Sequence, residues 1–172
     1  MGVAEYVATP HGRGPPMPIC QRLKSFLDAN SVHYEVIPHA RTYTAQGTAA
    51  SAHISGQELV KSIMVSGDGE HTLVATTANR RINLEKLRKE LGFGEVHLER
   101  EDEFMDLFND CEPGAMPPFG NLYGIPMVVD ESVYEDDEIA FNAGDHASLI
   151  RINLADFERL VTPKIAAVAD PS

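Results

Sequence analysis

Residues 113–120, with the sequence PGAMPPFG, limit the possible folds of this chain more than any other segment. Proline and glycine at this density exclude a helix or a central strand, so the segment must be a loop. Gly114 can adopt backbone angles that are closed to other residues, and Pro117 and Pro118 stiffen the chain after it. Such a loop can simply turn the chain, or it can point backbone N–H groups at one spot and bind a carbonyl or carboxylate oxygen there.

The chain on the N-terminal side of this loop predicts a mixture of helices and strands. Apolar residues recur at helical spacing over 19–27, and the alanine-rich stretch 44–52 also favours a helix. Between them, HYEVIPH alternates as a strand does and closes at Pro38. The remaining elements predicted here are a strand over 61–66, its hairpin partner over 72–77 and a helix between Asn83 and Gly92.

The chain on the C-terminal side of the loop predicts more strands and one last helix. The apolar run PMVVD is typical of an interior strand. EIAFNAG and ASLIRIN predict a hairpin whose bend carries Gly144, Asp145 and His146, and Asn153 is positioned to cap the final helix. Because helices and strands mix without regular alternation, we expect an α+β fold with a mixed, largely antiparallel sheet.

The length of 172 residues is enough for one domain with a substantial core. Residues 1–17 carry glycines and prolines without a periodic apolar pattern, which predicts a disordered tail. We therefore expect a single domain over 18–165, followed by a short C-terminal tail over 166–172.

Charge limits the partners of this chain. Its 14 basic and 26 acidic side chains give a net charge of −12, which argues against broad, non-specific binding of nucleic acid. A local basic patch is still present over 80–89, with five basic residues and one acidic residue. It can steer an acceptor stem or form an ordinary solvated face. The acidic stretch 95–112 predicts a helix with Phe104, Leu107 and Phe108 on its apolar side.

Neither a membrane nor a metal is expected from the composition. No apolar run approaches the roughly 20 residues that a membrane span requires. The two cysteines, Cys20 and Cys111, form no CxxC motif and have no metal-ligand spacing to a histidine, so we interpret them as structural thiols. A reducing cytoplasm fits this pattern, and we expect no cofactor.

Lys61 has an unusual position in its predicted strand. Alternation puts it on the same face as Ile63 and Val65, which is the apolar face. Its stem can pack at the edge of the core while the ammonium reaches solvent, or the ammonium can bind a substrate.

Taken together and in this order, ELVKSIMV, RRINLEKLRKELG, PGAMPPFG and FNAGDHASLIRI resemble the YbaK/prolyl-tRNA synthetase editing-domain family of aminoacyl-tRNA deacylases. The similarity covers roughly 19–161. Lys61 matches the family's lysine, 114–118 its G-x-x-x-P loop, and Gly144 with His146 its G-x-H segment. The resemblance implies a mixed sheet that forms a partly closed barrel with helices around it.

The resemblance also implies the site residues. The implied catalytic residues are Lys61, Gly114 and His146. The implied substrate-binding residues are His39, Thr42, Thr44, Ala115, Met116, Pro117, Pro118, Gly144 and Asp145. Asp145 and Pro117 depart from the family pattern, which often has a small residue and a serine at these two positions. The specificity for an amino acid therefore stays open.

The activity implied by the resemblance is trans-acting hydrolysis of the ester in mischarged tRNA, commonly proline tRNA carrying alanine or cysteine. The implied partners are the acceptor end of an aminoacyl-tRNA and, as a further candidate, an aminoacyl-tRNA synthetase. Two alternatives remain at this stage: a non-catalytic module of the same fold that binds tRNA or a synthetase, and an esterase that acts on a small molecule. The sequence predicts no oligomeric state.

Overall fold

The computed structural model describes residues 20–172. The predicted tail over 1–17 lies outside the described residues. The helices are α1 (Gln21–Ala29), α2 (Ala45–Ala52), α3 (Leu84–Leu91), α4 (Glu101–Phe104) and α5 (Leu154–Val161). The first five strands are β1 (Glu35–Pro38), β2 (Leu59–Gly67), β3 (Glu70–Thr77), β4 (Arg80–Ile82) and β5 (Val96–Leu98). The others are β6 (Met127–Asp130), β7 (Glu138–Asn142), β8 (Ser148–Asn153), β9 (Lys164–Ala166) and β10 (Ala169–Pro171).

One mixed sheet forms the centre of the molecule. Its strand order is β1-β8-β7-β2-β3-β6-β9, with β5 paired to β2 beside this path. Four of the pairings are antiparallel (β1–β8, β7–β8, β2–β3 and β2–β5), and three are parallel (β2–β7, β3–β6 and β6–β9). The predicted α+β class with a mixed, largely antiparallel sheet is therefore confirmed. The strand order does not return from β9 to β1, so the sheet is not a closed barrel.

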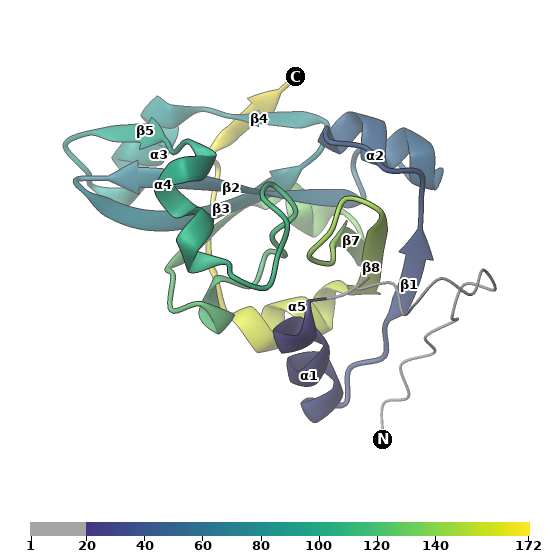
Figure 1. The fold of residues 1–172 in the computed structure, drawn as a ribbon. Coiled ribbons are helices and arrows are strands. Elements are labelled where there is room, and N and C mark those ends of the chain that lie inside the picture. The colour runs from purple at the N-terminus through teal and green to yellow at the C-terminus, as the bar shows by residue number, and fades with distance from the viewer. Residues whose placement is uncertain (1–19) are drawn as a thin grey trace.

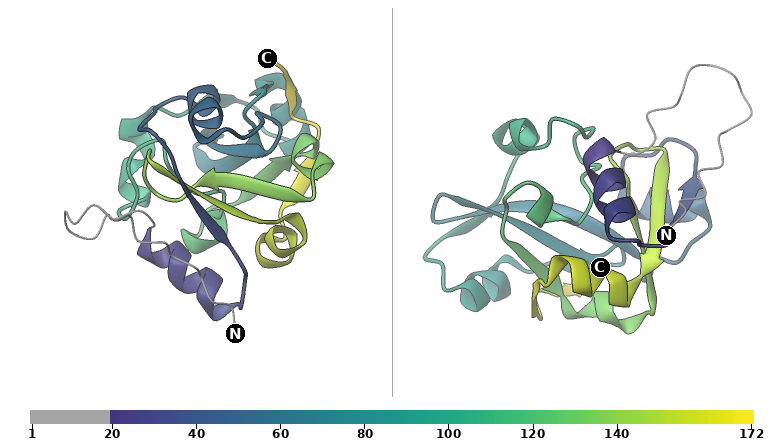
Figure 2. Two further views of the ribbon diagram at one scale, coloured as in Figure 1. Left: turned by 90° about the vertical axis from the view of Figure 1, so that its right-hand side faces the viewer. Right: turned by 90° about the horizontal axis from the view of Figure 1, so that it is seen from below.

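Helices cover both faces of this sheet. In Figure 1, α1 and α5 lie below the sheet and α2 and α3 lie above it, and the view from below in Figure 2 shows α1 and α5 in front. The lower face packs Val60 and Phe141 against residues of α1 and α5 in the largest apolar cluster. On the upper face, α2 covers a cluster around Leu59 and α3 covers one around Val65. Residue alternation in the strands produces these two faces.

Local sequence signals explain several element boundaries. Asn83 caps α3 as expected, because its side chain accepts the N–H groups of Glu85 and Lys86 at 3.1 Å each. Gly92 ends the helix with a φ of 69°. Asn153 does precede α5, but its side chain makes no capping hydrogen bond.

Two segments differ from the prediction. The acidic stretch 95–112 is not one helix but the strand β5, the short helix α4 and a 3₁₀ turn over Met105–Leu107. The expected C-terminal tail over 166–172 instead contributes β10, which pairs with β4, and Val168 and Ala169 are buried. Short β5 and β10 lack a long alternating pattern, so the sequence alone gave no sign of them. No helix within residues 20–172 combines the length and apolar character that crossing a bilayer requires.

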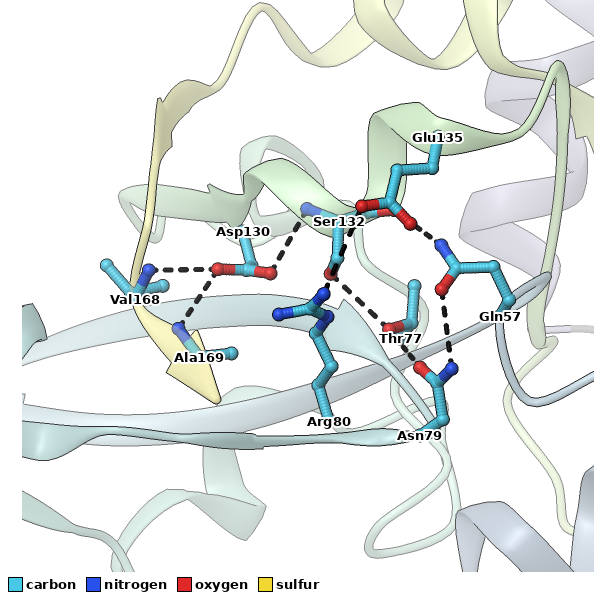
Figure 3. Close-up of polar contacts among 9 residues, drawn as sticks. All are labelled: Gln57, Thr77, Asn79, Arg80, Asp130, Ser132, Glu135, Val168 and Ala169. Atoms are coloured by element: carbon cyan, nitrogen blue, oxygen red, sulfur yellow. Dashed lines mark hydrogen bonds and ion pairs between the residues drawn. The ribbon is translucent and has the colours of Figure 1, made fainter. Parts of the chain in front are cut away.

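The buried carboxylate of Asp130 holds this C-terminal segment in place (Figure 3). Asp130 is 1% exposed, and one of its oxygens accepts the N–H groups of Val168 at 2.9 Å and Ala169 at 3.0 Å. The other oxygen accepts the N–H of Ser132 at 3.1 Å. Hydrogen bonds to an ionised buried acceptor are stronger than those between neutral groups. The carboxylate therefore joins the end of β6 to the start of β10.

Replacement of Asp130 should destabilise the fold by releasing the C-terminal segment that carries β10. Asp130→Ala leaves three buried N–H groups without their acceptor, and we expect the free energy of unfolding to fall by about 2–4 kcal/mol. Denaturation in urea measures this loss. Asp170→Ala, an exposed aspartate on β10 itself, should lose much less. Equal losses in the two variants would show that Asp130 is not the main attachment.

Candidate active site

The loop over 113–118 and the bend between β7 and β8 are joined by backbone hydrogen bonds. Gly144 N–H donates to the carbonyl of Ala115 at 3.1 Å, and Glu112 N–H donates to the carbonyl of Gly144 at 2.7 Å. The buried His146 ring adds a third link, because its Nε2 donates to the carbonyl of Pro113 at 2.7 Å. Figure 1 shows this loop, which follows α4, beside the β7–β8 bend. Two of the predicted segments therefore form one structural unit.

Gly114 lies directly against His146. Its φ is +82°, a left-handed backbone angle that strongly favours glycine. A Cβ at this position would lie 3.4 Å from Cε1 of His146. Of the N–H groups in this loop, that of Ala115 donates to the carbonyl of Glu112 at 3.0 Å, whereas those of Gly114 and Met116 make no hydrogen bond within the described chain. Because Met116 is buried and Gly114 is exposed, the Gly114 N–H is the donor that a substrate oxygen can reach.

Residues 39–44 form the next side of this unit. His39 N–H donates to the carbonyl of Ala147 at 2.9 Å, and Thr42 N–H donates to that of His146 at 3.3 Å. The exposed ring of Tyr43 packs on the His146 ring, with 4.8 Å between the ring centres. Tyr43 could not be selected from the sequence, since a single aromatic residue forms no pattern.

The hydroxyl groups of Thr42 and Thr44 are already engaged. Thr42 Oγ1 lies 2.6 Å from Thr48 Oγ1, and Thr44 Oγ1 caps α2 by accepting the N–H of Gly47 at 3.0 Å. Thr44 is thus a helix cap in this structure. His39 differs from both, because its Nε2 is buried without a hydrogen-bond partner.

Strand pairing places Lys61 beside the residue that leads into the Gly144 bend. Val60 pairs with Phe141 in the parallel β2–β7 ladder, so Lys61 follows next to Asn142, the last residue of β7. Val60 and Phe141 both project into the lower cluster. Because side chains alternate, Lys61 and Asn142 both project from the upper face.

Two buried oxygen atoms without partners lie on the same face as Lys61. Thr76 is the direct cross-strand partner of Lys61 in β3, and such partners project to the same side. Thr76 Oγ1 and Asn142 Oδ1 are both buried and have no hydrogen-bond partner in the described part of the chain. Buried polar atoms are seldom left unpaired, so these two are suited to receive polar groups of a ligand. Neither residue was expected, because a threonine or asparagine in a strand is not a sequence signal.

The half-buried ammonium of Lys61 has no carboxylate partner within residues 20–172. Burial alone therefore determines the shift of its pKa, which is lowered from the ordinary lysine value. A lysine that is desolvated without a counter-charge can accept a negatively charged group, such as a phosphate or a developing oxyanion.

Asp145 adds a carboxylate to the bend. Burial raises its pKa, while hydrogen bonds from the N–H groups of Ala147 and Ser148 oppose this effect. Arg41 and Glu112 form an ion pair nearby, and both act on Asp145 electrostatically, with opposite signs. The carboxylate lines a cavity of about 290 Å³ together with Gly144 and Glu112.

The apolar part of the loop faces a different space. Met116 and Pro113 line a second cavity of about 250 Å³, whose other apolar walls include Phe104 and Phe108. Ala115, Pro117 and Pro118 are buried and fix the shape of the loop. Met116 therefore supports the loop from behind through an apolar cluster that also contains Met64.

Most of the basic residues over 80–89 have acidic neighbours. The ion pairs are Arg80 with Glu135 at 4.0 Å, Lys86 with Asp170 at 2.6 Å, Arg88 with Glu85 at 2.7 Å and Lys89 with Glu85 at 3.9 Å. This arrangement favours a solvated, locally neutralised face over a strong patch for nucleic acid.

Solved structures share this fold. A crystal structure described as a candidate trans-editing enzyme for prolyl tRNA synthetase has a TM-score of 0.77 and 21% identity, and the match covers 90% of this chain and 98% of that one. A hypothetical protein, APE2540, has a TM-score of 0.78 and 20% identity, with coverage of 87% of this chain and 100% of that one. At this level of identity, the similarity shows the fold.

Sequence comparison defines the class and the family. The protein is an aminoacyl-tRNA deacylase of the editing type. The sequence model for the aminoacyl-tRNA editing domain matches residues 39–160, and the chain belongs to that family. The Ser/Thr-tRNA deacylase ProXp-y of Escherichia coli, in strains K12 and O157:H7, is 28% identical over 152 residues, which cover 84% of this chain and 89% of the relative. The resemblance to aminoacyl-tRNA editing domains that the sequence motifs indicated is confirmed.

Removal of the Lys61 charge should not weaken the fold. Because burial lowers its pKa, the folded state holds the proton less tightly than the unfolded chain, so the charged lysine costs stability at neutral pH. We expect Lys61→Met to unfold at an equal or higher denaturant concentration at pH 7. This advantage should shrink as the pH rises through the lowered pKa toward the ordinary lysine value, where the lysine is neutral in both states.

Urea midpoints across this pH range measure the effect. Lys89→Met, at an exposed position on α3, should show no such trend. A clear loss of stability in Lys61→Met would mean that the ammonium has a structural partner.

Proposed function

We propose that this deacylase removes a small, hydroxyl-bearing amino acid, serine or threonine, from tRNA at a site formed by Lys61, the Gly114 loop and the His146 bend. The observation that carries the proposal is the pair of unpartnered oxygens, Thr76 Oγ1 and Asn142 Oδ1, on the same face as Lys61. A substrate hydroxyl can satisfy such groups, whereas a methyl group leaves them unpaired. The activity for which the Escherichia coli relative is named, Ser/Thr-tRNA deacylation, supports the same choice.

The reaction is hydrolysis of an already activated ester. Water attacks the carbonyl carbon, the bond to the ribose oxygen breaks, and a proton passes to that oxygen. The accessible N–H of Gly114 would stabilise the negative charge that develops on the carbonyl oxygen. Lys61 would bind the same oxygen or a phosphate of the tRNA end, and the Asp145 carboxylate would bind the ammonium of the amino acid.

His146 has a positioning role in this proposal. Its Nε2 proton is committed to the carbonyl of Pro113, so the ring fixes the loop that carries Gly114. The Nε2 of His39 is also buried, but it has no hydrogen-bond partner within residues 20–172, so it could accept a proton donor of the substrate if the segment 39–44 moves. The side chain of Thr44 is occupied as the N-cap of α2, so it attaches the end of segment 39–44 to that helix.

Alanine or cysteine on proline tRNA is the second candidate substrate, favoured by the family resemblance of the loop and the lysine. The fold of the candidate editing enzyme for prolyl tRNA synthetase supports it as well. A synthetase would then be a partner that presents the charged tRNA. Both candidates place the protein in the cytoplasm, where charged tRNA is used.

A panel of charged tRNAs separates these candidates. We expect seryl- and threonyl-tRNA to be deacylated at least about tenfold faster than alanyl-tRNA, the effect of one hydrogen bond of about 1.4 kcal/mol. Lys61→Met should lower the rate by about 100-fold or more on every substrate. Faster turnover of alanine or cysteine on proline tRNA would replace the serine and threonine assignment. Binding of tRNA without turnover would favour a non-catalytic module, and hydrolysis of small esters alone would favour an esterase.

Two glycine variants test the loop itself. Gly114 and Gly69 have nearly equal φ angles, +82° and +85°, but a Cβ at Gly69 would have no neighbour within 4 Å. Alanine should therefore cost about 1–2 kcal/mol of stability at either position because of the left-handed angle. Only Gly114→Ala should also lose activity, by about tenfold or more, since relief of the strained angle would turn the N–H that the proposal assigns to the substrate oxygen. Matched losses of activity in both variants would assign the loop a purely structural role.

A further inference from the structure

The two cysteines of the chain meet at one place beside the candidate active site. Cys20, at the start of α1, is buried, and Cys111, just before the glycine–proline loop, is partly buried. The ligand atoms of Cys20, Asp110 and Cys111 all lie within 4.8 Å of one another. The sequence could not indicate this cluster, because the two cysteines are far apart in the chain and only the fold brings the start of α1 against the loop.

From this cluster we infer a binding site for a thiophilic divalent cation, with Zn²⁺ as the preferred ion. The ligands would be Cys20, Cys111 and Asp110, and Tyr123 would occupy the fourth coordination position. The inference does not rest on the proposed function. It would give these cysteines a role beyond that of the structural thiols expected from the sequence.

Several distances within the cluster are near the edge lengths of a tetrahedral zinc site. Tyr123 Oη lies 3.4 Å from Cys20 Sγ, 3.3 Å from Cys111 Sγ and 2.8 Å from Asp110 Oδ1. Cys111 Sγ lies 3.6 Å from Asp110 Oδ1. A zinc ion with bonds of about 2.3 Å to sulfur and about 2.0 Å to oxygen has S–O edges of about 3.5 Å and an S–S edge of about 3.8 Å. Small side-chain movements would close the set around the ion, because all ligand atoms of Cys20, Asp110 and Cys111 already lie within 4.8 Å of one another.

Hydrogen bonding alone satisfies this cluster only in part: Cys20 Sγ caps α1 by accepting the N–H of Leu23 at 3.4 Å, but its other contacts are weak. The hydroxyl of Tyr123 has one proton, and it donates this proton to Asp110. The contacts to the two sulfurs then depend on thiol protons, which are weak donors. A soft or borderline cation satisfies both sulfurs and the carboxylate at once, and the thiols exclude Mg²⁺ and Ca²⁺ as preferred ions.

Access and charge also fit a cation. The cavity of about 290 Å³ that contains Gly144 and Asp145 is lined by Cys20, Asp110 and Cys111 as well, so an ion has a path from solvent. Two thiolates and a carboxylate would carry three negative charges against two on the ion. The guanidinium of Arg22, which packs over the Tyr123 ring at 4.7 Å from its centre, lies near enough to offset the excess.

A bound ion would connect the segments on either side of the Gly144 bend. Cys20 N–H donates to the carbonyl of Ala143 at 2.7 Å, and Glu112 N–H, next to Cys111, donates to that of Gly144 at 2.7 Å. The cation would therefore fix the start of α1 to the chain that precedes the glycine–proline loop. Binding should stabilise the folded state by mass action.

Cobalt titration tests the site. The reduced, metal-free full chain is titrated with Co²⁺, and absorption from thiolate-to-cobalt charge transfer is recorded together with the visible bands of tetrahedral cobalt. We expect saturation at one equivalent, loss of the spectrum on addition of Zn²⁺, and a higher melting temperature with Zn²⁺ than without metal.

Variants connect the signal to the residues. Cys20→Ser and Cys111→Ser should each lose the charge-transfer band, and Asp110→Asn, which keeps both thiols, should bind about 10-fold or more weakly. His97→Ala, at an exposed histidine, should bind cobalt as the parent chain does. Melting curves without metal check that each variant folds.

Two results would overturn the inference. One is the absence of a thiolate band in the folded parent chain. The other is a band that survives in both serine variants. If the parent chain binds no cobalt but loses both thiols after mild peroxide treatment, the pair forms a disulfide, with two thiols and one peroxide giving one disulfide and two waters, and the metal assignment is wrong.

Discussion

The site depends on the close contact of two loops around Gly144. The N–H of Gly144 donates to the carbonyl of Ala115, and its carbonyl accepts the N–H of Glu112. These two residues lie on either side of the turn at Pro113 and Gly114. Its φ of +106° and the presence of Cys20, whose Cβ would lie 2.7 Å from a Cβ on Gly144, leave room for glycine only. Because two backbone hydrogen bonds and the ring of His146 hold the bend against the turn, the positions of Gly114 and His146 are fixed relative to each other. A rigid scaffold of this kind is what preorganised catalysis needs.

The polar groups around Lys61, in contrast to those of the two loops, are not satisfied within the described residues. An ammonium without a carboxylate partner, together with the unpaired oxygens of Thr76 and Asn142, lowers the stability of the fold. The apolar clusters under α2 and α3 lie on either side of this polar strip and can offset its cost. Uncompensated polar groups of this kind concentrate at functional sites, because a ligand completes their interactions.

The charge distribution fits recognition of a tRNA end better than recognition of a whole tRNA. A chain with a net charge of −12 gains little from long-range attraction to phosphate. The basic residues over 80–89 are mostly matched by acids on their own surface. At the proposed site, binding would instead come from short-range contacts, because Lys61 has no carboxylate partner among residues 20–172, and this arrangement suits the small terminal ester of a charged tRNA.

The sequence by itself determined the local structure and the class of protein. Helix caps such as Asn83 and Gly92, the hairpin of β2 and β3, and the order of the lysine, loop and histidine segments are local patterns, so they could be predicted before any contact was known. The fold decided everything that depends on residues distant in sequence: the C-terminal strand held by Asp130, the unpaired oxygens next to Lys61, and the meeting of Cys20 with Cys111. Periodicity reports which face of an element is buried, but not which residues of other elements lie against it, and chemistry at a site depends on the latter.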